Sequence, residues 1–127
     1  MLSLLLLDVH KGFAWVMILG NALAGLWALA AHKVEALRVR ALWWFVVLVE
    51  CTIFVQVAMG VGLVSGKGID PPKFHLFYGF VAIIAVGILY SYRSTSAWVR
   101  KNQYLVYGFG SLFLMGLGIR AMLVAAR

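Results

Sequence analysis

The sequence predicts an all-α membrane protein, a bundle of four transmembrane helices in antiparallel up-down-up-down order. Four apolar runs cover residues 12–31, 41–66, 74–92 and 104–126, and each has about the 20-residue length that a helix needs to cross a bilayer core. Only 12% of the 127 residues are charged, against about 25% in soluble domains, and the mean hydropathy is +1.00. We therefore expect residues 1–127 to form a single integral membrane domain.

The segments flanking the runs define the ends of the expected helices. Before the first run, the leucine-rich residues 2–7 lack the preceding basic region of a signal peptide, so we expect them to be retained and to extend the first helix or lie in the interface. The loops of residues 32–40, 67–73 and 93–101 are short, and short loops favour antiparallel neighbours. Proline suits the first turn of a helix, so the third helix is expected to begin near Pro72.

The basic residues indicate an orientation in the plasma membrane. The loops after the first and third runs hold six of them, Lys33, Arg38, Arg40, Arg93, Arg100 and Lys101, and the opposite side holds Lys11, Lys67, Lys73 and Arg127. Cytoplasmic loops carry the excess of Lys and Arg. Both termini are therefore expected outside the cell. The net charge of +7 is then explained by basic residues that contact lipid headgroups at the helix ends. We therefore expect no nucleic-acid partner.

Metal binding and catalysis have little support in the sequence. The single cysteine, Cys51, has no second cysteine for a disulfide or a CxxC motif, and three scattered histidines with few acids predict no metal site. No serine lies with a histidine and an acid at a common depth, and no glycine-rich phosphate loop is present. We therefore expect no catalytic residues.

Small residues recur at helical spacing and predict helix contacts. In lipid, helices associate through close packing, which small side chains permit. The predicted packing positions are Ala58, Gly62, Gly66, Gly108 and Gly116. Most of this surface is expected to pack inside the bundle, and the remainder favours docking against other membrane protein subunits.

Three of the polar residues within the apolar runs are candidates for function. Glu50 lies roughly 13 Å from the inner end of the second run, where a charged side chain costs about 2.5–3.5 kcal/mol. It is expected either to be neutral and hydrogen-bonded to a neighbouring helix or to handle protons or cations. Gln56 and Arg120 share a depth in the outer half, roughly 22 and 24 Å from the inner ends. Arg120 is expected to reach the outer headgroups, to bond Gln56, or to meet an anion.

The histidines raise the question of a cofactor. A b-type haem held by two histidines needs imidazoles on facing helices at one depth. His10 and His75 meet this condition, since both lie near the outer ends of the first and third runs, whereas His32 lies alone at the inner end. A quinone site built from His75, Tyr78, Gln56 and Arg120 is a related alternative.

Two stretches carry a resemblance to known proteins. They are FHLFYGF at residues 74–80 with YSYR at residues 90–93, and YGFG at residues 107–110 with GIRAM at residues 118–122. In these stretches the chain resembles small, uncharacterised four-span membrane proteins of actinobacteria. Accessory subunits of actinobacterial respiratory supercomplexes are of this general kind. The resemblance implies no functional residues, and its bearing on function is an analogy of fold.

Three functional hypotheses follow from these patterns. The main one is an integral membrane accessory or assembly subunit of a larger complex, plausibly respiratory, with no cofactor and no catalytic activity of its own. The first alternative is a small redox protein that binds haem b or a quinone through His10 and His75. The second is a small proton-linked transporter that depends on Glu50.

Overall fold

The structure, a computed structural model, describes residues 2–66 and 68–126, except for the side chain of Ser3. Its elements are α1 (Leu2–Lys33), η1 (Glu35–Leu37), α2 (Arg40–Val61), the π-helical turn η2 (Gly62–Gly66), α3 (His75–Thr95), α4 (Ala97–Lys101) and α5 (Gln103–Ala125). All regular structure in these described ranges is helical. Four of the helices are long and apolar enough to cross a membrane, in agreement with the predicted all-α class.

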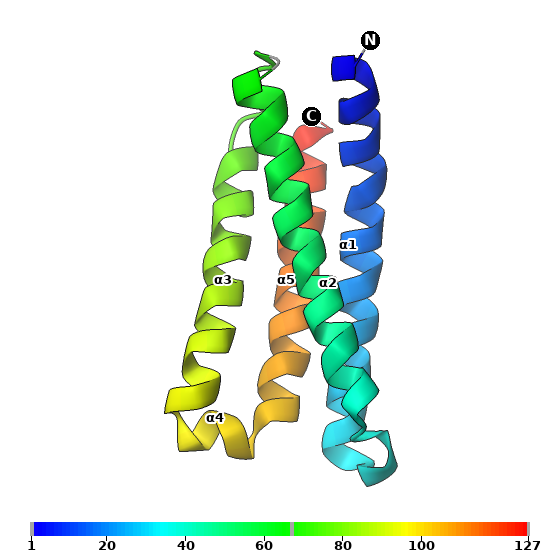
Figure 1. Cartoon of the computed structure of the whole chain (residues 1–127), viewed down its shortest axis with the longest axis vertical. Helices are drawn as coiled ribbons and strands as arrows, with labels where there is room; N and C mark the ends of the chain where they lie inside the picture. Colours follow the sequence, from blue (N-terminus) through cyan, green and yellow to red (C-terminus); the bar gives the residue numbers. More distant parts are fainter. Residues whose placement is uncertain (1, 67, 127) are drawn as a thin grey trace.

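The four long helices form one bundle in which α5 has a central place. Helix α1 packs against α5 and α2, and α3 packs against α5, whereas α2 and α3 contact each other much less. Successive long helices run in opposite directions, so both chain termini lie at one end of the bundle and α4 lies at the other (Figure 1). We call these the terminal end and the α4 end. The bundle therefore has one weakly packed seam, between α2 and α3.

The structure decides between the alternatives for the first helix start and shifts the start of the third helix from its expected position. The first helix begins at Leu2, because the leucine-rich segment continues the helix without a proline or glycine to break it. The third begins at His75 and not near Pro72, because Phe74 adopts a left-handed conformation with φ of 67° directly before it. This turn places His75 in the first turn of α3. The short helix α4 was not predicted; Ser96 caps it by accepting a hydrogen bond from the Val99 N–H at 3.2 Å.

Glycines make the closest approach between α1 and α5. Gly108 is buried, and a β-carbon there would lie 2.6 Å from Leu29 Cδ2 and 3.1 Å from the Leu29 backbone nitrogen. A β-carbon on Gly25 would lie 2.9 Å from the Gly108 carbonyl oxygen, and one on Gly118 would lie 2.2 Å from Met17 Cε. These contacts join the two most extensively packed helices. Gly108 is thus the predicted packing residue that the structure places at a close helix contact.

The other expected packing positions face outward. Ala58, Gly66 and Gly116 are exposed, and a β-carbon on either glycine would meet nothing within 4 Å. Gly62 is half-buried, and its β-carbon would have only an ordinary contact of 3.8 Å with Leu6. Ala58, Gly66 and Gly116 therefore face away from the interior of the bundle, and Gly62 lies at its edge. Four-residue spacing places residues on one helix face, but it does not determine which way that face points.

Candidate functional site

His10 and His75 lie against each other at the terminal end of the bundle. Their ring centroids are 5.9 Å apart and the ring planes make an angle of 74°. His10 lies in the third turn of α1, and His75 is the first residue of α3. Both side chains are half-buried. The two residues that the sequence paired by depth are thus neighbours in space, on helices that are not adjacent in the chain.

A backbone carbonyl orients the His75 ring. His75 Nδ1 lies 3.1 Å from the carbonyl oxygen of Ala121 in α5. A carbonyl oxygen only accepts hydrogen bonds, so Nδ1 carries the proton, and in the neutral ring Nε2 has the lone pair. Histidines that bind metals show this same arrangement, in which the second nitrogen donates to a carbonyl and fixes the tautomer. The lone pair of His75 Nε2 is therefore available to bind a metal ion.

Helix α2 supplies the surroundings of His10. Gln56 Nε2 donates a 2.6 Å hydrogen bond to the His10 carbonyl oxygen, which joins α2 to α1 at this depth. Gly60 lies one turn further along α2, where a β-carbon would come within 3.4 Å of His10 Cε1. His10 Nδ1 and Gln56 Oε1 are both buried and have no hydrogen-bond partner among the described residues. The ring of His10 thus lies beside a glycine that adds no side chain, and His10 Nδ1 and Gln56 Oε1 remain able to form hydrogen bonds.

Arg120 extends this polar group towards the surface. Its Nε donates a 3.2 Å hydrogen bond to the Tyr78 hydroxyl, and its side chain is exposed. It does not bond Gln56, whose Nε2 donates to the His10 carbonyl and whose Oε1 has no partner among the described residues. The Arg120–Gln56 pair, one of the three alternatives for Arg120, is therefore not formed.

Glu50 lies apart from this group, deeper in the bundle. Its side chain is 2% exposed, and neither carboxyl oxygen has a hydrogen-bond partner among the described residues. The hydroxyl group of Thr52, two residues further along α2, donates to the Val49 carbonyl at 2.5 Å and is not bonded to Glu50. Glu50 therefore belongs to a second site, on the weakly packed seam between α2 and α3.

Sequence reasoning missed several buried polar residues. Asn21 and Ser111 are almost fully buried, and Asn21 Nδ2 donates a 2.9 Å hydrogen bond to the Met17 carbonyl. Tyr107 is also buried, and its hydroxyl donates to the Leu89 carbonyl at 3.1 Å. The signal for Asn21 was available, since a carboxamide in the middle of an apolar run is costly in lipid unless it is bonded. Nothing in the local sequence of Tyr107 distinguishes it from an interfacial tyrosine.

Comparison of the chain with protein families, with curated proteins and with solved structures finds no match.

Proposed function

We propose that this protein is a small b-type cytochrome of the membrane, in which His10 and His75 bind the iron of one haem from opposite sides. The observation that carries the proposal is the 5.9 Å separation of the two imidazole centroids. A metal–imidazole bond is about 2.0–2.1 Å long, so two imidazoles on opposite sides of one metal have centroids roughly 6 Å apart. The observed separation fits this requirement.

The donor set favours haem over a bare metal ion. The described residues contain no group of three or more His, Cys, Asp and Glu side chains that would hold a metal. Structural zinc takes four protein ligands and catalytic zinc takes three, whereas haem iron needs only its axial ligands from the protein because the macrocycle supplies the rest. Two histidines suffice for a haem and are too few for zinc.

The surroundings of the histidines suit a large flat cofactor. Gly60 on α2 adds no side chain beside the ring of His10, and α2 and α3 form the least packed pair of neighbouring long helices. Lys11, Lys73 and Arg120 have exposed cationic groups at or near the terminal end, where they would meet the two propionates of a haem. With both axial positions filled by histidine, the iron has no open site, so the haem would pass single electrons and would not activate oxygen.

The visible spectrum of the purified protein tests this proposal. We expect protein expressed with sufficient haem to be red, with a Soret band, and to develop sharp α and β bands on reduction with dithionite. These are the features of low-spin iron with two axial nitrogen ligands. A colourless protein that still gives no Soret band after incubation with haemin would contradict the proposal.

Exposed small residues on α2, η2 and α5 favour a partner subunit for this cytochrome. Ala58, Gly66 and Gly116 are exposed, and small residues let another transmembrane helix approach closely. Under this second proposal the protein delivers electrons within a larger membrane complex, plausibly a respiratory one. Extraction in mild detergent followed by affinity purification should then recover other membrane subunits, in amounts that fall when Gly116 is replaced by leucine. If the Gly116→Leu variant recovered the same amount of other membrane subunits as the wild type, Gly116 would not be part of a subunit contact.

The proposed orientation puts both termini and the haem site on the outer side of the plasma membrane. The α4 end holds Arg38, Arg93 and Arg100, and the positive-inside rule assigns such an end to the cytoplasm. We expect alkaline phosphatase fused after residue 127 to be active and green fluorescent protein fused there to be dark. Fusions truncated within α4 should behave in the opposite way. A fluorescent full-length fusion would reverse the orientation.

A further inference from the structure

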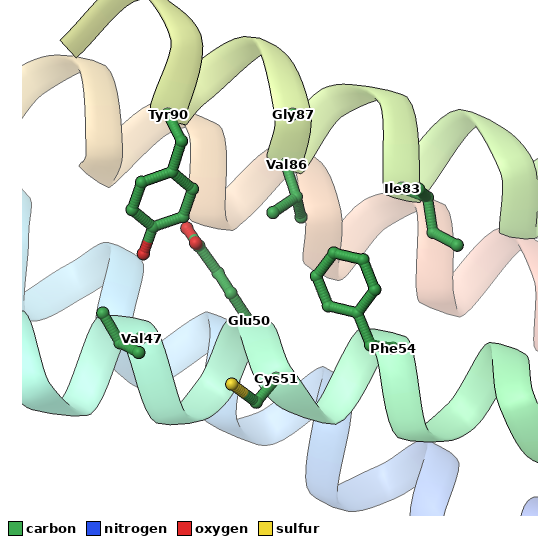
Figure 2. A pocket seen from close by; sticks show the side chains of 8 residues that line it. All are labelled: Val47, Glu50, Cys51, Phe54, Ile83, Val86, Gly87 and Tyr90. Atoms are coloured by element: carbon green, nitrogen blue, oxygen red, sulfur yellow. The ribbon is translucent and has the colours of Figure 1, made fainter. Parts of the chain in front are cut away.

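A pocket opens on the seam between α2 and α3, apart from the histidine pair. It has a volume of about 420 Å³, within the range of small-molecule sites of about 300–1,000 Å³. Its lining residues are Val47, Glu50, Cys51, Phe54, Ile83, Val86, Gly87 and Tyr90 (Figure 2). All but a few of their atoms are apolar. The pocket lies between two membrane-spanning helices, so a ligand reaches it from the lipid.

The polar groups of this pocket are concentrated at one end. The carboxyl group of Glu50 extends from α2 towards α3 and lies beside the ring of Tyr90 (Figure 2). Both of its oxygens are buried without a partner among the described residues. Buried polar atoms nearly always have hydrogen-bond partners, and leaving one without costs free energy. The single hydroxyl group of Tyr90 beside it could satisfy only one of these two oxygens, and the adjoining pocket is the space from which a further donor can come.

The neighbouring charge argues against a cation as that donor. Arg93 lies one turn beyond Tyr90 on α3, and its guanidinium stacks 4.8 Å from the centroid of the Trp43 ring and 5.7 Å from that of Tyr107. Two aromatic faces thus hold a positive charge close to the polar end of the pocket. A second cation would be repelled there, whereas a neutral hydroxyl group would not.

We propose that this pocket binds the ring of a lipid-soluble quinol, whose hydroxyl group donates a hydrogen bond to Glu50. The ring lies along the apolar wall between Phe54 and Tyr90, and Gly87 leaves the room for it, because a β-carbon at Gly87 would meet nothing within 4 Å. The choice of a quinol rests on the proposed cytochrome function, since a quinol is a membrane-soluble donor of electrons to haem. The pocket and the unpartnered carboxyl group do not depend on the haem.

Titration with menadiol, a quinol without a tail, tests this proposal. The haem-loaded protein is first reduced with dithionite in detergent, so that the ligand is not oxidised, and binding is followed by calorimetry. Gly87→Leu fills the pocket without a clash and should abolish saturable binding. Glu50→Leu should weaken it about tenfold or more, because a hydrogen bond to a carboxylate is lost. The control is Leu48→Ala, at a position on α2 where the leucine is 64% exposed. This variant should bind menadiol as the wild type does.

The dimethyl ether of menadiol distinguishes a site that binds through a hydrogen bond from an apolar groove that binds through hydrophobic contact alone. It has the same ring and no hydroxyl hydrogen, so it should bind at least about tenfold more weakly than menadiol. Equal binding of the two compounds, or menadiol binding that Gly87→Leu leaves intact, would overturn the proposal. An intact Soret band without menadiol binding would overturn the quinol site alone. Menadiol binding that depends on Glu50 and Gly87 in a protein without a Soret band would support the pocket and contradict the cytochrome.

Discussion

Replacing Gly108 with leucine is expected to prevent the bundle from assembling. A β-carbon at this position would already lie 2.6 Å and 2.7 Å from two side-chain carbons of Leu29 and 3.1 Å from the Leu29 backbone nitrogen. The Leu29 side chain can turn away, but its backbone cannot move without separating α1 from α5. Overpacking a core typically costs about 1–3 kcal/mol and sometimes more. Because the clash involves backbone at the principal helix contact, we expect a loss of at least about 3 kcal/mol.

The measurement is unfolding in mixed micelles of increasing SDS content, with the yield of monodisperse protein as a second readout. Gly116→Leu on the same helix is the matched control, since a β-carbon there meets nothing within 4 Å. It should unfold at nearly the wild-type SDS content. If Gly108→Leu were as stable as Gly116→Leu, the close approach of α1 and α5 would not be a requirement of the fold.

Loss of either paired histidine is expected to abolish low-spin, six-coordinate haem binding. Under the proposed function, His10→Ala or His75→Ala leaves a single axial ligand on the iron. The haem should then be lost on purification or appear as high-spin, five-coordinate iron. His32→Ala should keep the full Soret band, because His32 lies at the other end of α1, next to the C-terminal Lys33.

The haem content per protein, measured by the pyridine haemochrome method, gives the comparison. We expect less than about a tenth of the wild-type content in the double variant of His10 and His75, which retains no axial ligand from this pair. Normal yield and elution volume would show that the variants still fold, because the rings are only half-buried. Full content of low-spin haem in both single variants would show that the haem, if bound, has other ligands than this pair.

The histidine pair illustrates how far sequence reasoning reached in the site. Antiparallel order and equal depth were enough to select His10 and His75 and to set His32 aside. The hydrogen bond from His75 to the Ala121 carbonyl was not predictable, because it depends on the rotation of α3 about its axis and on its contact with α5. The partners of Gln56 and Arg120 were unpredictable for the same reason, and each proved to be on a helix other than the one expected.

The sequence by itself determined that the chain forms four long apolar helices, and it located Glu50, Gln56 and Arg120 as costly interruptions. Length, hydropathy and the short loops contain this information, because the bilayer permits few other structures for such a chain. Only the tertiary structure decided which helix faces meet. It placed Gly108 at the α1–α5 contact and turned Gly66 and Gly116 outward. It also left Glu50 beside a pocket on the α2–α3 seam. In lipid both faces of an apolar helix are equally acceptable to the surroundings, so hydrophobicity does not select the buried one, and side-chain packing does.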